Sequence, residues 1–326
     1  MPKTMIADLV PGGTVTDAFV VTSLKLAPFR NKPGQYLDLR LADRTGEIPA
    51  RMWDRAEETA EDLAPGTVVI VEARVDEYKG EKQLVLTDLR PAAPEEYQPG
   101  DFVRVASRPL EEMVEELRTV ISSLENAHLG LLLEAIFGDE EFLHRFVQAP
   151  GARYYHHACV GGLLQHTLAV TALCRQAAEL HPELDRDLLL AGALLHDLGK
   201  IFELQGELNI EFSDAGYFFG HVVLTDRFVT ERIAALPDFP PRLAELLTHI
   251  LLSHHGQRDW GAPVTPVIAE AFALHHADNL DAKVQMVTDY REHPEVERGN
   301  WSRWHRGLDT RLYLGPTSGF EDNEEE

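Results

Sequence analysis

The sequence predicts a multidomain protein in which a small N-terminal five-stranded β-barrel precedes an all-α region. Between about residues 15 and 89, apolar residues alternate with polar ones over short runs, which is the period of a β-strand. Beyond Pro109 the apolar spacing changes to three and four residues, which is the period of an amphipathic helix. The segment Pro91–Gly100, rich in proline, glycine and charge, separates the two patterns.

The expected barrel occupies residues 10–95, and its strands are short runs that end at turn residues. The alternation is clearest in Tyr36–Leu41, Ile48–Trp53, Val68–Val75 and Gln83–Leu89. Turns are expected where glycine closes a polar stretch, at Lys32–Gly34, Asp43–Gly46 and Lys79–Gly80. Five strands of this length fit a small closed barrel better than an open sheet.

The helical periodicity runs on to about residue 290. It predicts helices near residues 110–125, 128–137, 140–148, 163–180, 186–197, 217–235, 241–254 and 266–290. We assign residues 96–150 to a linker with connecting helices and residues 151–290 to the main helical domain. Residues 291–326 form a C-terminal segment with an acidic tail.

Composition indicates a soluble globular protein. Apolar residues make up 44% of the chain and charged residues 26%, which is normal for a protein that buries hydrophobic cores. The two cysteines, Cys159 and Cys174, are too few for a disulfide framework and indicate reduced thiols. Because no signal-peptide pattern or membrane-length apolar run is present, we expect a cytoplasmic protein with no membrane association.

The net charge of −24 argues at first against a polyanionic partner, because phosphates are bound mainly through lysine and arginine. The charge is unevenly distributed, however. Residues 1–97 carry 12 basic and 17 acidic side chains, a net −5, whereas the rest carries 18 and 37, a net −19. Five of those acids lie in the tail Glu321–Glu326. Bound cations would offset part of the remaining acidic charge.

A histidine and an aspartate follow the most apolar stretch of the helical region. His196 and Asp197 come directly after Leu188–Leu195, so we expect both side chains at a buried helix end. A buried carboxylate without a partner costs several kcal/mol, and a cation is its natural partner. Imidazole and carboxylate ligands without a thiolate cluster suit Mn²⁺, Fe, Co²⁺, Ni²⁺ or Zn²⁺, and Mg²⁺ remains an alternative. His166 upstream and Asp278 downstream would complete the ligand set.

The order His166, His196-Asp197, Asp278 resembles the HD superfamily of metal-dependent phosphohydrolases, in which these positions bind one metal. His221 and the pair His254-His255 are similar to the additional ligands of the binuclear branch of that superfamily. The resemblance therefore implies one or two divalent ions per chain. Adjacent helical residues diverge by about 100°, so one histidine of the pair would turn away if the helix continued. His156, His157, His249, His275 and His276 are expected to support ligands, contact substrate or pack.

Such ions would polarise a water molecule and neutralise charge on a phosphate, which is the chemistry of phosphodiester hydrolysis. We expect His196 and Asp197 to act at the catalytic centre. Lys200, four residues after His196, would lie on the same helical side and contact a non-bridging phosphate oxygen. The alternative for Lys200 is a solvated lysine at a helix C-terminus.

The barrel is expected to have the topology of an OB fold, whose open face binds single strands through aromatic and basic side chains. If Leu37, Leu39 and Leu41 point inward, their neighbours on the same strand point outward. The candidate nucleic-acid-binding residues are Lys25, Phe29, Arg30, Lys32, Tyr36, Arg40, Arg51, Trp53, Arg74, Tyr78, Lys79 and Lys82. The alternative is that Tyr36 and Trp53 complete the barrel core and the basic residues are merely solvated.

Three local strings, Leu41–Ile48, His156–Gly162 and Asp278–Val284, together with the order of barrel and HD domain, resemble the YhaM family of 3′-to-5′ exoribonucleases. The resemblance spans about residues 10–315. It implies an OB-fold module that binds RNA, an HD domain that favours Mn²⁺, and stepwise release of nucleotides from a 3′ end. It also implies some activity on single-stranded DNA.

The combined interpretation is a two-domain hydrolase whose barrel captures single-stranded RNA and whose helical domain cleaves it. We also expect identical chains to associate into an oligomer. One alternative is an HD phosphohydrolase that acts on a small nucleotide, with the barrel serving assembly or regulation. Another is a non-catalytic RNA-binding adaptor whose metal site is structural.

Overall fold

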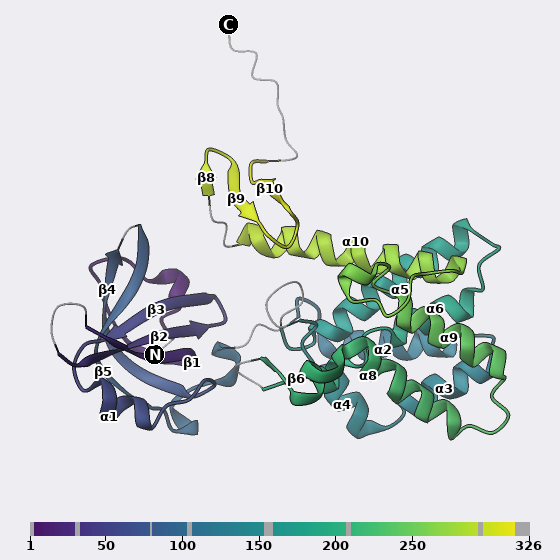
Figure 1. The fold of residues 1–326 in the computed structure, drawn as a ribbon, viewed down its shortest axis with the longest axis horizontal. Coiled ribbons are helices and arrows are strands. Elements are labelled where there is room, and N and C mark those ends of the chain that lie inside the picture. Colours follow the sequence, from purple (N-terminus) through teal and green to yellow (C-terminus); the bar gives the residue numbers. More distant parts are fainter. Residues whose placement is uncertain are drawn as a thin grey trace, which may run out of the picture.

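In the computed structural model, a β-barrel is joined to a helical domain, and a small sheet follows the last helix (Figure 1). The structure describes residues 3–29, 33–78, 80–102, 106–152, 159–206, 210–292 and 296–316. The predicted fold class is confirmed, with a closed barrel in residues 14–91 followed by helices. None of the described helices is long and apolar enough to cross a membrane.

The barrel consists of β1 (Thr14–Pro28), β2 (Gln35–Asp43), β3 (Gly46–Met52), β4 (Val68–Tyr78) and β5 (Glu81–Pro91). The strands follow the order β1-β2-β3-β5-β4 and close into a barrel. β1 pairs antiparallel with both β2 and β4, and its register with β2 shifts between Val21 and Ser23. Such irregularities bend a strand, which lets β1 serve both sides of the barrel. The short helix α1 (Ala56–Glu61), between β3 and β4, was not predicted.

Alternation along β2 determines which side chains fill the barrel. Leu37, Leu39 and Leu41 are at most 2% exposed, so the predicted inward face is correct. Tyr36 and Arg40 therefore lie on the outer surface, where each is at least partly exposed. The outer surface of β2 and β3 is thus available for binding.

The helical domain begins after two short 3₁₀ helices, η2 (Pro94–Glu96) and η3 (Pro99–Asp101). Its helices are α2 (Leu110–Ser122), α3 (Ala127–Phe137), α4 (Glu140–Gln148), α5 (Gly162–Leu180), α6 (Arg186–Leu195), α7 (Lys200–Glu203), α8 (Asp214–Ala234), α9 (Pro241–Ser253) and α10 (Ala269–Glu292). The two-residue strands β6 (Leu204–Gln205) and β7 (Glu211–Phe212) pair between α7 and α8. The predicted helices are all present, with ends that differ by a few residues.

Helix α6 is the centre of this domain. The apolar residues of Leu188–Leu195 are at most 2% exposed, because α3, α5, α9 and α10 pack around the helix. The Asp185 side chain caps the first turn by accepting a hydrogen bond from the Leu188 amide. Helices α2, α3 and α4 contribute to the same hydrophobic core as α5 to α10. The C-terminal end of α6 is therefore held deep inside the domain.

Two features of the fold depart from the predicted helical pattern. Helix α8 is interrupted at Gly220, whose φ of 68° and ψ of 158° are not helical. After α10 the chain forms a three-stranded sheet of β8 (Val296–Arg298), β9 (Trp301–His305) and β10 (Thr310–Tyr313), in the order β10-β9-β8. These strands are too short, and too poor in alternating apolar residues, for their period to be recognised in the sequence.

The turn between α6 and α7 packs directly against α8. The amide of Gly199 donates to the Thr225 hydroxyl at 2.8 Å, which brings the two backbones together. A Cβ atom at Gly199 would collide with the His221 carbonyl oxygen and would lie 2.7 Å from the Thr225 amide nitrogen. Glycine is therefore required here by close approach.

We predict that Gly199→Ala lowers the free energy of unfolding by roughly 1–3 kcal/mol, the usual cost of overpacking. Urea denaturation followed by circular dichroism measures this change. Gly130→Ala in α3 is the matched control, because a Cβ atom there meets no atom within 4 Å. The control should be neutral or stabilising by up to about 1 kcal/mol, since alanine is the better helix former. Equal effects of the two substitutions would contradict the close contact.

Candidate metal centre

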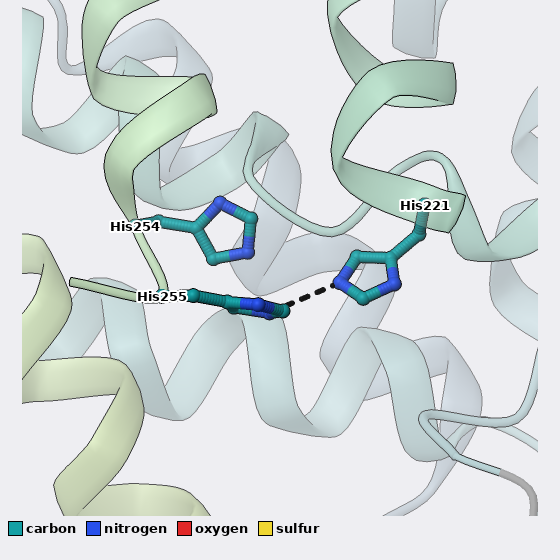
Figure 2. Close-up of side chains that lie close together, drawn as sticks. All are labelled: His221, His254 and His255. Atoms are coloured by element: carbon teal, nitrogen blue, oxygen red, sulfur yellow. Dashed lines mark hydrogen bonds between the residues drawn. The ribbon is translucent and has the colours of Figure 1, made fainter. Parts of the chain in front are cut away.

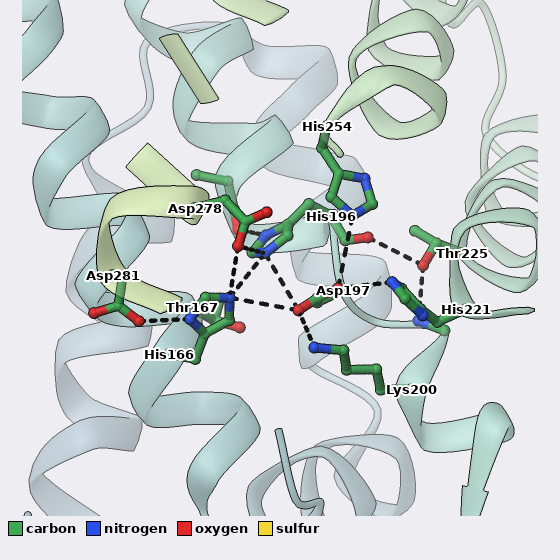
Figure 3. Close-up of polar contacts among 12 residues, drawn as sticks. His166, Thr167, His196, Asp197, Lys200, His221, Thr225, His254, Asp278 and Asp281 are labelled. Atoms are coloured by element: carbon green, nitrogen blue, oxygen red, sulfur yellow. Dashed lines mark hydrogen bonds and ion pairs between the residues drawn. The ribbon is translucent and has the colours of Figure 1, made fainter. Parts of the chain in front are cut away.

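The seven residues predicted as metal ligands lie together where five segments of the helical domain meet. Figure 3 labels six of them, and Figure 2 labels the seventh, His255. Helices α5, α8 and α10 contribute one residue each. Two residues directly follow α6, and two directly follow α9. They are His166, His196, Asp197, His221, His254, His255 and Asp278. Residues up to 112 positions apart are thus brought to one place by helix packing.

The first group of ligand atoms surrounds the Nε2 atom of His166. This atom lies 3.3 Å from His196 Nε2, 3.5 Å from Asp197 Oδ2 and 3.2 Å from Asp278 Oδ1. His166 and His196 are fully buried, and Asp197 is 4% exposed. Two imidazoles and two carboxylates therefore converge at the end of α6.

The second group contains His221, His254 and His255 (Figure 2). Their ligand atoms all lie within 4.8 Å of one another, and His221 Nε2 is 3.1 Å from His255 Nε2. His254 and His255 both face the site because α9 ends at Ser253, so the expected divergence of adjacent helical residues does not apply. Gly256, with a φ of +75°, turns the chain away directly afterwards.

Asp197 connects the two groups because each of its carboxylate oxygens faces one of them. Oδ2 lies 3.4 Å from His196 Nε2, on the side of the first group. Oδ1 lies 3.4 Å from His221 Nε2 and 3.7 Å from His254 Nε2, on the side of the second. One buried carboxylate is thus shared by two sets of imidazoles.

The five histidines are oriented by hydrogen bonds from their other ring nitrogen. Nδ1 of each ring contacts an oxygen atom: His166 contacts Asp281 at 2.6 Å, His196 the Ala193 carbonyl at 2.8 Å, His221 the Glu203 carboxylate at 3.0 Å, His254 the Leu251 carbonyl at 2.7 Å and His255 the Trp260 carbonyl at 2.8 Å. Carbonyl and carboxylate oxygens accept hydrogen bonds, so Nδ1 donates. In a neutral ring, Nε2 then carries a lone pair directed into the site.

This tautomer assignment tests whether the residues fit a metal ion. Nδ1 is the donor in both His221 and His255, so the tautomers in which only Nδ1 carries a proton place two Nε2 lone pairs 3.1 Å apart. The buried Nε2 atom of His254 has no hydrogen-bond partner among the described residues. Lone pairs that converge without donors repel one another, and a cation between them removes the repulsion. The donor set therefore fits divalent metal.

The electrostatics of the first group favour positive charge. Burial by itself would raise the pKa of Asp197, but Lys200 and His196 hold that pKa well below its ordinary value, so the carboxylate is ionised. The pKa of Asp278 is also lowered, despite burial, by its contact with His166. Burial opposes protonation of His166, yet Asp197, Asp278 and Asp281 raise its pKa well above the ordinary value.

The second group has the opposite character. Burial lowers the pKa of His254 well below its ordinary value, and the neighbouring His255 and His196 add to the effect. Burial and the nearby His221 likewise lower the pKa of His255. Both rings are therefore neutral near pH 7, which is the form that binds a metal.

A cavity of about 490 Å³ gives access to both groups. Asp197, His221, His255 and Asp278 line it, together with residues from α7, β7, η4 (Arg258–Trp260) and α10. Lys200 also lines the cavity, and its Nζ atom donates to Asp197 Oδ2 at 2.6 Å. Lys200 was expected on the same helical side as His196 if the helix continued, but α6 ends at Leu195 and α7 begins at Lys200, so a turn brings this lysine to the cavity. A phosphate in this cavity would be close to both Lys200 and Asp197.

Several residues that shape the site were not assigned from the sequence. Asp281 and Glu203 orient His166 and His221, and Glu203 also accepts from the His221 backbone amide at 2.9 Å. Asp281 follows Asp278 by three positions, so helical spacing could have identified it. Glu203 has no such signal, because it meets His221 through tertiary packing. His156 and His157 lie outside the described residues.

On the barrel, three of the predicted aromatic residues form one cluster. Ring centroids are 4.8 Å apart for Tyr36 and Trp53, 5.6 Å for Phe29 and Tyr36, and 6.0 Å for Phe29 and Trp53. Trp53 is 39% exposed. The rings therefore lie on the outer surface of the barrel and do not complete its core.

Next to this aromatic cluster is a groove of about 300 Å³, lined by the predicted residues Lys25, Arg40, Arg51 and Tyr78. Its positive charge is partly neutralised, because Asp38 lies 3.2 Å from Lys25 and 3.5 Å from Arg51.

The remaining predicted basic residues of the barrel lie elsewhere. Arg74 forms an ion pair with Asp76, and Lys82 donates to the Leu9 carbonyl at 2.6 Å, so the groove includes neither. Arg30, Lys32 and Lys79 lie outside the described residues.

Comparison with known proteins agrees with this architecture. The sequence model of the OB-fold nucleic acid binding domain matches residues 18–92, and that of the HD domain matches residues 163–283. The 3′-5′ exoribonuclease YhaM of Bacillus licheniformis is 34% identical over 300 residues, which cover 91% of this chain and 93% of that protein. YhaM of Bacillus subtilis is 34% identical over 301 residues, with the same two coverages.

A relative from another genus gives the same result. The 3′-5′ exoribonuclease YhaM of Listeria monocytogenes is 32% identical over 311 residues, covering 94% of this chain and 96% of that protein. The matches extend through the barrel, the connecting helices and the helical domain. This chain therefore belongs to the YhaM family, whose members combine an OB-fold nucleic acid binding domain with an HD domain.

Proposed function

We propose that this protein is a metal-dependent 3′-to-5′ exoribonuclease that hydrolyses single-stranded RNA and releases nucleotides from the 3′ end. The single observation that carries the chemistry is the position of Asp197 between two groups of histidines whose Nε2 atoms converge. The RNA substrate and the direction follow from curated relatives of that name, which cover more than nine-tenths of the chain. Single-stranded DNA is proposed as a further substrate.

Two divalent ions fit the two groups. One would be held by His166, His196, Asp278 and Oδ2 of Asp197, and the other by Oδ1 of Asp197 and the three histidines of the second group. We favour Mn²⁺, because it accepts both imidazole and carboxylate ligands and the site contains no thiolate. When bound, such ions lower the pKa of a coordinated water and neutralise charge on the phosphate.

The protein's own residues position the substrate for this reaction. Lys200 lies in the cavity wall beside Asp197, and we propose that it contacts a non-bridging phosphate oxygen of the scissile group. Glu203 and Asp281 hold the rings of His221 and His166, so the ligands need not reorganise when substrate binds. Phe212, Trp260 and Met286 provide apolar walls for the terminal nucleotide.

The barrel would hold the strand through its aromatic cluster. Stacking on Phe29, Tyr36 and Trp53 accepts any base, since every base has a π-face. Lys25 and Arg51 in the adjacent groove would contact phosphates in place of Asp38. This surface distinguishes a nuclease from a hydrolase that needs only a nucleotide pocket.

A hydrolase that acts on small nucleotides is the second candidate. The cavity volume of about 490 Å³ is typical of small-molecule sites and favours this alternative. Comparing turnover of an oligoribonucleotide with turnover of mononucleotides separates the two. A non-catalytic adaptor is not favoured, because the metal ligands line an accessible cavity instead of a closed structural site.

We predict that Asp197→Asn abolishes RNA cleavage, because it weakens ligation on both sides of the shared carboxylate. End-labelled single-stranded RNA with Mn²⁺ should shorten from its 3′ end with the parent protein. The variant should be slower by more than the ~10–100-fold that loss of a ligand-orienting partner costs. Asp62→Asn, at an exposed position after α1, is the control. Unchanged cleavage by Asp197→Asn, or faster turnover of mononucleotides than of RNA, would contradict the proposed nuclease.

Glu203→Gln should weaken one ion and leave the other, since Glu203 supports only His221 in the second group. The expected loss of affinity is about 10–100-fold. Calorimetric titration of the metal-free protein with Mn²⁺ measures both binding events. Asp281→Asn should weaken the other event through His166. Glu231→Gln, exposed on α8, is the control and should change neither. A single Mn²⁺ binding event that Glu203→Gln and Asp281→Asn weaken equally would argue against two ions.

Trp53→Ala should raise the Kd for single-stranded RNA by about tenfold or more, the usual effect of losing one stacking ring. Fluorescence anisotropy in the presence of a chelator measures binding without cleavage. Trp53→Phe keeps a ring and should retain most of the affinity. Hydrolysis of a dinucleotide, which is too short to reach the barrel, should be unchanged in both variants. Parent-like RNA affinity of Trp53→Ala would exclude the aromatic cluster from the binding surface.

A further inference from the structure

The C-terminal sheet of β8, β9 and β10 carries large aromatic side chains on its surface. Trp301, Trp304 and Tyr313 are 49%, 54% and 38% exposed. The sheet lies outside the residues matched by the OB-fold and HD domain models, and it contributes nothing to the metal centre. Exposed apolar side chains that gather in one place mark interaction sites. The aromatic surface of this sheet is therefore a candidate interaction site.

A β-bulge places these rings on the same face. Trp301 pairs with Tyr313 and Trp304 pairs with Arg311, so two residues of β9 oppose the single residue Leu312 of β10. Residues three apart in a regular strand face opposite sides, and the extra residue restores Trp304 to the side of Trp301. The ring centroids of Trp301 and Tyr313 are 5.4 Å apart.

The other face of the sheet is used for packing. Ser302 is fully buried, Leu312 is 8% exposed, and the Leu312 amide donates to the Ser302 hydroxyl at 2.8 Å. His305 packs edge-on against Tyr290 of α10, with ring centroids 5.1 Å apart. The sheet is thus anchored to α10 through one face, and the aromatic face is left to solvent.

The charge around the aromatic face is positive in a strongly acidic protein. Residues 296–313 contain four arginines, Arg298, Arg303, Arg306 and Arg311, against two acids, Glu297 and Asp309. The local net charge is therefore +2 in a chain of net −24. Glu297 pairs with Arg311 at 2.8 Å, whereas Arg298 and Arg306 take part in none of the ion pairs found among the described residues.

Helix α10 links this surface to the metal centre (Figure 1). Asp278, Ala282 and Met286 line the cavity at successive turns of α10, and Tyr290 at the next turn contacts β9. Glu292 lies 14 positions after Asp278, which corresponds to about 21 Å along the helix axis. The cavity wall therefore leads along α10 towards the sheet.

We propose that this C-terminal sheet is a second binding surface for single-stranded RNA. Trp301, Trp304 and Tyr313 stack on bases, while Arg298, which lies opposite Trp301 in the sheet, contacts a phosphate. The inference rests on the proposed function. If the 3′ end lies in the metal centre, the nucleotides on its 5′ side can continue along α10 to the sheet. Exposed rings interleaved with arginines are the usual platform for single strands.

The test compares Trp301→Ala/Trp304→Ala with the parent. We expect its Kd for an oligoribonucleotide of about 20 nucleotides, longer than the ~4–16 that one OB fold covers, to rise at least tenfold. Fluorescence anisotropy in the presence of a chelator measures this Kd without RNA cleavage. Dinucleotide hydrolysis with Mn²⁺ should equal that of the parent. Trp301→Phe/Trp304→Phe keeps the rings and should restore most of the affinity.

Two variants with the same change of charge test whether arginine on the sheet contacts RNA phosphates. Arg298→Glu should raise the Kd and flatten its salt dependence. Arg242→Glu, whose side chain is 76% exposed on α9, should do neither. Parent-like RNA affinity of the double alanine variant would overturn the proposal. So would a fall in its mass by light scattering, which would show that the face holds a second copy of the chain. Failure of the parent to cleave the dinucleotide would instead count against the nuclease, while the Kd comparison would still decide the role of the sheet.

Discussion

The helical domain is organised around the buried carboxylate of Asp197 and the histidines that surround it. Four histidine rings direct Nε2 towards this carboxylate, and each of them gives its Nδ1 proton to an oxygen atom on its other side. Such an arrangement is unfavourable in a buried setting unless positive charge is present. The hydrogen bonds thus hold the ligands in advance, and a bound ion gains affinity because little has to be reordered.

The rest of the domain keeps this arrangement in place. Helix α6 is buried on all sides, so His196 and Asp197 leave it at a fixed depth. The close contact of Gly199 with α8 then sets the distance between Asp197 and His221. α5 and α10 contribute His166 and Asp278 from the other side. Stability and ligand geometry therefore depend on the same packing, and a substitution in the core would disturb both.

The fold class and the pair His196-Asp197 could be predicted because both leave local signals, whereas the other five converging residues were identified through resemblance to the HD superfamily. Apolar periodicity distinguishes strand from helix, and His196-Asp197 stands directly after the apolar run of α6. The orienting residue Glu203 left no such signal, since it meets His221 only after α7 and α8 have packed. Lys82 was assigned to RNA binding from its position in a hairpin, but its amine is used by the Leu9 carbonyl. The aromatic face of β9 depends on a bulge, which the period of a strand cannot reveal.

The break in α8 at Gly220 has a consequence for how His221 responds to its surroundings. A continuous helix would use the His221 amide for its own hydrogen bonding, whereas here that amide and the ring of the same residue both donate to Glu203. The ligand is therefore attached at two points to α7. The turn of α8 before the break packs against the same glutamate, since a Cβ atom at the buried Gly216 would collide with the Glu203 carbonyl oxygen. Movement of that turn, as nucleotides enter and leave, would then reach the imidazole through Glu203 and not along the helix backbone.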